Sequence, residues 1–210
     1  MSRYAKLTTW LLGAWFVITF IAAGLHLYRN GPDQPPLAFG LGALTPVILF
    51  VVWFTLSPSF REFTMSLNPR ALTLVQTLRI AGWIFLVLAT YNILPRVFAW
   101  PAGWGDIAIG VTAPLAALKL ATPARRRSFI VWQLLGIADL VTAVSLGTLA
   151  GVINPHGIPT TAMTVLPMSL IPTFAVPLFL MLHVICIAQA LRWPEHEKQP
   201  AAQQRHAEAF

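Results

Sequence analysis

Two ionisable side chains, Asp139 and His183, lie inside long apolar stretches of this sequence. A charged side chain at the middle of a membrane costs about 2.5–3.5 kcal/mol on insertion scales, so it should face protein or a water-filled cavity. Counted at about 1.5 Å per residue from the basic residue next to each stretch, the two side chains differ in depth by about one helical turn. We therefore predict that Asp139 and His183 form a hydrogen-bonded pair if their helices pack side by side.

Such a pair could do chemistry, or it could hold two helices together. An imidazole titrates close to neutral pH, and carboxylates inside membranes mark proton and ion pathways, so the pair could relay protons or bind a cation. As a structural clasp between helices it would contribute about 0.6 kcal/mol. Gly136, Thr142 and Ala143 recur with Asp139 at helical spacing and would let a second helix approach closely.

A second polar group is expected near the outer membrane surface. Its members are His26, Tyr91, Asn92, Arg96 and Asp106. The stretch 97–106 is rich in Pro, Gly and Trp, which predicts a tight elbow between two helices with Arg96 and Asp106 paired across it. Asp106 would also complement the positive end of the helix that follows. The functional alternative is a polar pocket that opens outward, and we assign Tyr91 and Asn92 to the intramembrane polar site as hydrogen-bonding groups.

A haem site is the alternative use of the histidines. Bis-histidine ligation needs two imidazoles at matching depth on facing elements, and histidine is a common axial ligand of haem iron. The candidates are His26, His156 and His183, of which His26 and His156 match because both are expected near the outer surface. With haem or a quinone, the chain would be a redox subunit of a membrane complex.

The composition decides the class of fold. The chain has 210 residues, of which 57% are hydrophobic and 10% are charged, whereas soluble domains have about a quarter charged residues. Apolar stretches of about 20 residues predict transmembrane helices. We predict an all-α polytopic membrane protein, with a transmembrane domain over residues 1–192 and a polar cytoplasmic tail over 193–210. Its six transmembrane helices are predicted at about 8–28, 37–56, 70–94, 104–120, 129–152 and 168–191.

The basic residues predict the orientation. Of the 14 Lys and Arg residues, Arg29 and Arg96 fall in loops on one side of the six predicted helices, and all the others fall on the opposite side. Because basic loops stay in the cytoplasm, both termini are predicted to be cytoplasmic. The net charge of +7 is thus explained by membrane orientation rather than by binding of nucleic acid. A single cysteine, Cys186, excludes an intramolecular disulfide.

Proline interrupts every second predicted helix. Pro46 follows Gly42, Pro114 follows Gly110, and the last helix carries two prolines. Proline frees backbone carbonyls that can line a site inside a membrane. Together with Asp139 and His183, this predicts small-solute or proton-linked transport, or sensing, through a polar site among the last four helices. The alternatives are the redox subunit and a non-catalytic accessory subunit of a larger complex. No phosphate loop, nucleophile elbow or nucleophile–base spacing is present, which favours a protein that is not an enzyme.

One segment carries a resemblance. The sequence Pro-Ala-Gly-Trp-Gly-Asp-Ile at 101–107, continuing to Gly110 and to Pro114, resembles small bacterial multipass membrane proteins of uncharacterised function. The resemblance covers the third and fourth predicted helices and implies no activity and no catalytic residue. We expect a multipass protein of the cytoplasmic (inner) membrane of a bacterium, surrounded by lipid, that forms a homo-oligomer or joins a larger membrane complex.

Overall fold

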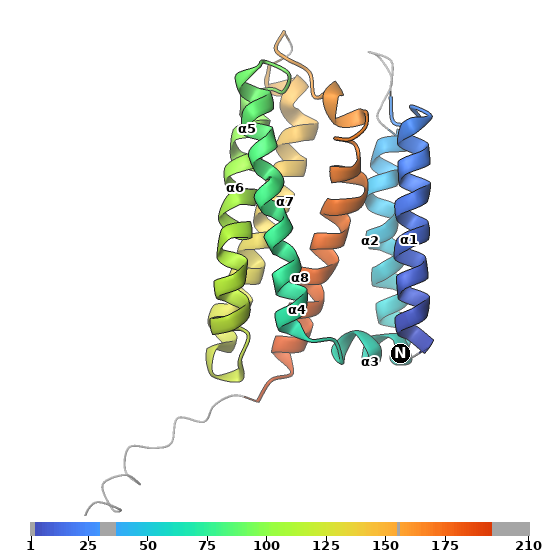
Figure 1. The fold of residues 1–210 in the computed structure, drawn as a ribbon, viewed down its shortest axis with the longest axis vertical. Coiled ribbons are helices and arrows are strands. Elements are labelled where there is room, and N and C mark those ends of the chain that lie inside the picture. The colour runs from blue at the N-terminus through green and yellow to red at the C-terminus, as the bar shows by residue number, and fades with distance from the viewer. Residues whose placement is uncertain (1–2, 30–36, 155, 195–210) are drawn as a thin grey trace, which may run out of the picture.

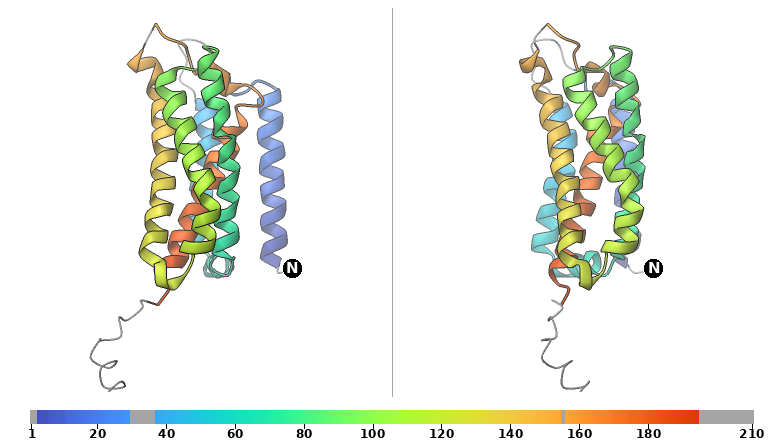
Figure 2. Two further views of the ribbon diagram at one scale, coloured as in Figure 1. Left: turned by 60° about the vertical axis from the view of Figure 1, so that its left-hand side comes forward. Right: turned by 90° about the vertical axis from the view of Figure 1, so that its left-hand side faces the viewer.

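A computed structural model describes residues 3–29, 37–154 and 156–194, and within these ranges the chain is all-α, with helices, turns and no strand. Its long helical columns run alternately up and down one bundle (Figure 1), and the rotated views show the same arrangement (Figure 2). Short helices occupy the connections. The columns are α1 (Arg3–Gly24), α2 (Leu37–Leu56), α4 (Pro69–Val75) with η1 (Gln76–Gly82) and α5 (Trp83–Thr90), α6 (Arg96–Leu115) with η2 (Ala116–Leu120), α7 (Arg126–Ile153), and η5 (Ile171–Ala175) with α8 (Val176–Leu191). The short helices are α3 (Pro58–Met65), η3 (Pro123–Arg125) and η4 (Thr161–Thr164).

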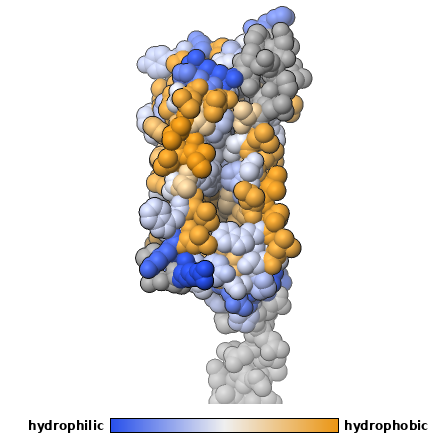
Figure 3. Space-filling view, turned by 90° about the vertical axis from the view of Figure 1, so that its right-hand side faces the viewer, coloured by the Kyte–Doolittle hydropathy of each residue, from blue (hydrophilic) through white to orange (hydrophobic). Residues whose placement is uncertain are grey.

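The surface of the bundle is apolar along most of its length. Figure 3 shows hydrophobic side chains down one face and hydrophilic ones towards its two ends. Five described helices are long and apolar enough to cross a membrane: Arg3–Gly24, Ala38–Leu56, Pro69–Thr90, Pro123–Gly151 and Ile171–Leu191. The column of α6 and η2 is not one of these five, because Asp106, two prolines and several glycines and tryptophans lower its hydropathy. Length and composition thus indicate a membrane protein without establishing a sixth span.

The expected elbow at 97–106 is wrong, because this stretch is helical. The chain turns earlier, at Tyr91 and Asn92, where Asn92 takes a positive φ of 54°. Pro95 is the extended N-cap residue, and α6 begins at Arg96. Pro101 lies within the helix and leaves one backbone carbonyl without its usual donor, which is tolerated when neighbouring helices cover it. The Pro, Gly and Trp residues that suggest a loop are therefore part of a helix, in which Gly103 is buried while Trp100, Pro101 and Trp104 are exposed.

A helix also occupies the expected loop at 59–68. In α3 the Ser57 hydroxyl accepts a hydrogen bond from the Phe60 N–H at 3.3 Å, and Pro58 occupies the first turn. At its other end, Gln189 Nε2 donates to the carbonyls of Thr64 at 3.0 Å and Leu67 at 2.8 Å. These bonds satisfy carbonyls that the end of a helix leaves free. Figure 1 shows α3 lying across the end of the bundle, between α2 and α4.

The first and last columns also differ from the predicted boundaries. α1 ends at Gly24 rather than near residue 28, and His26 follows in a turn with a φ of 59°. The last column begins with the π-helical turn η5 at Ile171 instead of at residue 168. Pro177 has no N–H for the carbonyl of residue 173, and the chain widens there so that the Val176 N–H bonds to the Ile171 carbonyl. The predicted tail at 193–210 lies almost wholly outside the described residues.

Candidate functional site

The buried polar site begins with four residues spaced three apart: Thr73, Gln76, Arg79 and Gly82. In an α-helix, with about 3.6 residues per turn, such residues drift around the axis, whereas in a 3₁₀-helix residues i and i+3 eclipse. The 3₁₀-helix η1 places Gln76, Arg79 and Gly82 on one face, and all three are buried. Runs of this length are uncommon, and a 3₁₀ stretch within a longer helix often marks a functional hinge.

Arg79 is the centre of the site, and its side chain is 0% exposed. Its Nε donates to Asp106 Oδ1 at 2.7 Å, and its Nη2 donates to Asp139 Oδ2. Its Nη1 donates to the carbonyl of Gly136 at 3.3 Å and lies 3.4 Å from His183 Nε2. One guanidinium in η1 thus contacts side chains of α6, α7 and α8, which lie side by side with it.

Glycines make room for each polar partner of Arg79. A Cβ atom added at Gly82 would meet the Asp106 side chain, one at Gly105 would meet the Asp139 carboxylate, and one at Gly136 would meet the His183 ring. At Gly110 it would lie 2.5 Å from the backbone nitrogen of Ile80, which follows Arg79. Small residues let helix backbones approach closely, and here they let four columns converge on one guanidinium.

The hydrogen-bond directions around His183 follow from the chemistry of arginine. A guanidinium has no acceptor, so His183 Nε2 must accept from Arg79, and the proton of the neutral ring is on Nδ1. Nδ1–H then donates to Gln133 Oε1, and Gln133 Nε2 donates to Thr73 Oγ1 at 3.1 Å. The Thr73 hydroxyl donates to the carbonyl of Pro69 at 2.8 Å. The result is a continuous chain of buried donors and acceptors from Arg79 to the first residue of α4.

The charges of the site do not balance. With both carboxylates ionised, Asp106 and Asp139 carry two negative charges and Arg79 carries one positive charge. Among the described residues, no other basic side chain pairs with either carboxylate. Both carboxylate side chains keep 16% exposure, whereas Arg79 has none. The site can therefore accept one further positive charge, on the side where the carboxylates remain accessible.

An unsatisfied acceptor lies on the same face as Arg79. Gln76 is 1% exposed, and its Nε2 donates to the carbonyl of Phe179 at 3.2 Å. Its Oε1 has no hydrogen-bond partner in the described part of the protein. A buried oxygen of this kind usually finds a water or an ion. Gln76 therefore extends the polar site by one turn of η1 toward Thr73.

The structure brings Asp139 and His183 together, but through Arg79. No direct hydrogen bond joins them within the described ranges, and each binds a different nitrogen of the guanidinium. Asp106 belongs to the same cluster. The expected Arg96–Asp106 pair is therefore wrong, because Asp106 binds Arg79, and Arg96 is exposed at the start of α6.

The other predicted site residues lie elsewhere. Tyr91 and Asn92 are exposed in the turn after α5, a full helix α5 away from Arg79, so they do not line the buried cluster. His26 is exposed in the turn after α1, and His156 is exposed beside an undescribed residue. Any functional role of these four residues stays a prediction.

The geometry does not favour His183 as a haem ligand. Both ring nitrogens are engaged, Nδ1 by Gln133 and Nε2 by Arg79. The Trp132 ring also lies beside the imidazole, with centroids 5.8 Å apart. Within the described ranges, no three His, Cys, Asp or Glu side chains gather in a way that could hold a metal ion. Iron ligation by His183 would require these contacts to break.

The sequence interpretation missed Arg79, Gln133 and Thr73 as parts of the site. In the orientation prediction, Arg79 is counted among the basic residues on the side opposite Arg29 and Arg96, which treats it as a loop residue. The three-residue spacing of Thr73, Gln76, Arg79 and Gly82 was the available signal. On α7, Gln133, Gly136 and Asp139 repeat the same spacing and mark the face that meets Arg79.

A comparison with protein families finds a match over most of the chain. A family model matches residues 36–191, which run from the start of α2 to the end of α8 and include every residue of the Arg79 cluster. The chain belongs to the family described as Domain of unknown function (DUF8737). The DUF8737 region leaves out α1, which contributes no side chain to the cluster. No curated protein and no solved structure matches the chain.

Proposed function

We propose that this protein is a small membrane protein that carries out proton- or cation-linked transport of a small solute, or senses the same ion, through the Arg79 cluster. The observation that carries the proposal is the charge imbalance of Arg79, Asp106 and Asp139. A net negative charge inside a membrane is costly, so the cluster favours a bound proton or a small monovalent cation. The excess is a single negative charge, so an ion that binds there can also be released.

Two further features support exchange of that ion. The partly exposed carboxylates of Asp106 and Asp139 offer an entry point, and the bonded chain from His183 to Thr73 offers a polar route along the inside of α4. The 3₁₀ geometry of η1 provides an element that could change its helical form when the ion changes.

The proposal includes a specific membrane topology. We place six spans in the bacterial inner membrane, with α6 and η2 as the span added to the five most apolar helices and with both termini in the cytoplasm. Basic residues at the α1 start, at α3 and at the α6–α7 turn support this orientation. Arg79 no longer counts toward it, because its side chain is buried in the cluster rather than exposed in a loop.

The proposal also includes assembly. A second copy or another membrane subunit beside the exposed part of the two site carboxylates would shield them from lipid and would enclose the path of the ion between the subunits. A non-catalytic accessory role predicts a stoichiometric partner instead of ion exchange by the isolated protein. Purification in mild detergent, followed by mass measurement of the intact particle, separates these arrangements.

Ion flux tests the proposal. Purified protein in liposomes is exposed to a proton gradient, or to a Na⁺ or K⁺ gradient, with the membrane potential clamped. Wild type should equilibrate at least one of these gradients faster than empty liposomes, and Asp139→Asn should reduce the rate to that of empty liposomes. Glu62→Gln is the matched control, because Glu62 is exposed on α3 away from the cluster. Equal rates for wild type and Asp139→Asn would refute transport through this site.

A further inference from the structure

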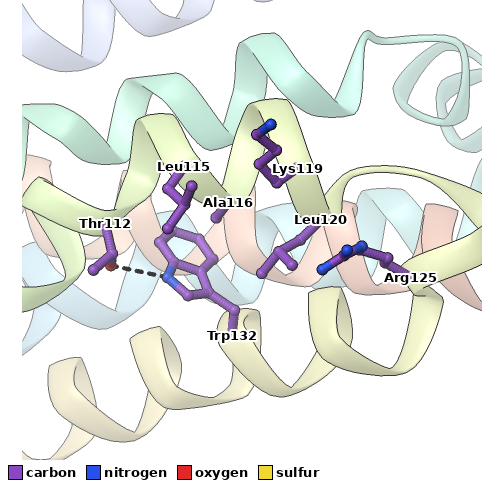
Figure 4. Close-up of a pocket in the computed structure, with 7 residues that line it drawn as sticks. All are labelled: Thr112, Leu115, Ala116, Lys119, Leu120, Arg125 and Trp132. Atoms are coloured by element: carbon purple, nitrogen blue, oxygen red, sulfur yellow. Dashed lines mark hydrogen bonds between the residues drawn. The ribbon is translucent and has the colours of Figure 1, made fainter.

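A groove lined by none of the residues that bond to Arg79 opens between α6–η2 and the start of α7. Its volume is about 470 Å³. It is lined by Thr112, Leu115, Ala116, Lys119, Leu120, Arg125 and Trp132. Figure 4 shows Trp132 lying across from Leu115 and Ala116, with Arg125 turned back toward Leu120. The groove thus has an apolar floor, with the Arg125 guanidinium at one end and the Lys119 side chain at its edge, pointing away from the indole in this view.

Local structure explains the shape of the groove. Trp132 Nε1 donates to Thr112 Oγ1 at 3.0 Å, and this bond ties the indole of α7 to α6. Ala116 is too small to fill the space in front of the ring. The chain then leaves the helix after Leu120 and returns through η3, which sets the two helices apart at this end. Lys119 lies seven positions after Thr112, which corresponds to about 10 Å of helix at about 1.5 Å per residue.

The basic residues at the mouth have no acidic partner. Lys119 and Arg125 are exposed, and neither pairs with a carboxylate in the part of the chain that the structure describes. Their end of the bundle also carries Arg70 and Arg127, which belong to the predicted cytoplasmic side. Basic pockets between transmembrane helices on this side of a membrane suit anionic lipid headgroups.

We propose that this groove binds one anionic phospholipid from the cytoplasmic leaflet, an inference that rests on the membrane topology above but not on ion exchange at Arg79. The lipid phosphate lies between Arg125, whose guanidinium suits a phosphate, and Lys119, whose flexible stem lets the ammonium reach it. The first part of an acyl chain lies along Leu120, Leu115 and Trp132. The apolar floor distinguishes this occupant from a free phosphate ion, which would gain nothing from it.

Lipid binding is tested on the full chain in detergent micelles by native mass spectrometry. Phosphatidylglycerol and phosphatidylcholine are added at equal concentration, and the lipid retained on the protein is counted. Wild type should retain phosphatidylglycerol in preference, and Lys119→Gln with Arg125→Gln should lower that preference about tenfold. Arg70→Gln with Arg127→Gln, which removes the same charge outside the groove, should leave it unchanged. All four side chains are exposed, so the variants should fold.

Three results would overturn the proposal. Wild type could retain both lipids equally, which would remove the headgroup preference. The control pair could lose as much binding as the groove pair, which would reduce the effect to general surface charge. Inorganic phosphate could displace the lipid completely at low ionic strength, which would make the groove a site for a free anion. None of these outcomes depends on ion flux through the Arg79 cluster.

Discussion

Arg79 Nε donates a hydrogen bond to Asp106 Oδ1 at 2.7 Å, across 27 residues of sequence. The two residues lie on adjacent helical columns, and Gly82 removes the side chain that would otherwise fill the space beside Asp106. This contact moves Asp106 from the expected outer surface into the interior. It also makes Arg79 a shared partner of two carboxylates, and the proposed function depends on that relationship.

Removing the charge of Arg79 should strongly destabilise the protein. Arg79→Met leaves two largely buried carboxylates without a cation, and breaking a buried ion pair from one side costs about 3–5 kcal/mol. Adding Asp106→Asn and Asp139→Asn to Arg79→Met should restore much of the loss, because no uncompensated charge then remains. Thermal unfolding in detergent measures both changes. Arg70→Met, at an exposed position of α4, should change the unfolding temperature little. Equal effects at the two arginines would show that the Arg79 pairs do not stabilise the fold.

The glycines beside the cluster should not tolerate a methyl group. Gly105→Ala and Gly136→Ala place a Cβ on the Asp139 carboxylate and the His183 ring, and such overpacking typically costs about 1–3 kcal/mol. At Gly13 and Gly151 an added Cβ meets nothing within 4 Å, and alanine there should be neutral or stabilise the helix by up to about 1 kcal/mol. Unfolding in detergent compares the four variants. A loss of stability at the control positions as large as at Gly105 would contradict the close approach.

His183 should carry its proton on Nδ1. The ¹⁵N spectrum of histidine-labelled protein reports which ring nitrogen is protonated, and His183→Gln assigns the signal. Gln133→Leu removes the acceptor of the Nδ1–H group and should cost about 1–3 kcal/mol, as expected for a buried donor left without a partner. A signal from the Nε2-protonated ring would contradict the bond from Arg79, because a protonated Nε2 is itself a donor and cannot accept a hydrogen bond from the guanidinium.

The sequence predicted the all-α class well, because long apolar runs separated by basic loops are compatible with few folds other than a bundle of helices. Asp139 and His183 stood out for the same reason, since charge is rare within such runs. Asp106 was misplaced because Pro and Gly mark turns in soluble proteins, whereas both are frequent within transmembrane helices, where glycine lets helix backbones approach closely. Arg79 was missed because hydropathy alone cannot tell a boundary arginine from a buried one. Its position depends on partners from three other columns, which no local pattern specifies.

The exchangeable ion can be observed most directly by infrared difference spectroscopy of the carboxyl groups. The sequence has seven acidic residues, and only two of them belong to the cluster. The difference spectrum of the double variant Asp106→Asn, Asp139→Asn is therefore subtracted from that of the wild type, which removes the signals of the other five. Wild type in lipid, compared between acidic and alkaline pH or with and without Na⁺ or K⁺, should then show a carboxyl band that changes with the ion. The same difference spectrum in wild type and in the double variant would mean that neither Asp106 nor Asp139 exchanges a proton or a cation, and the proposed function would be wrong.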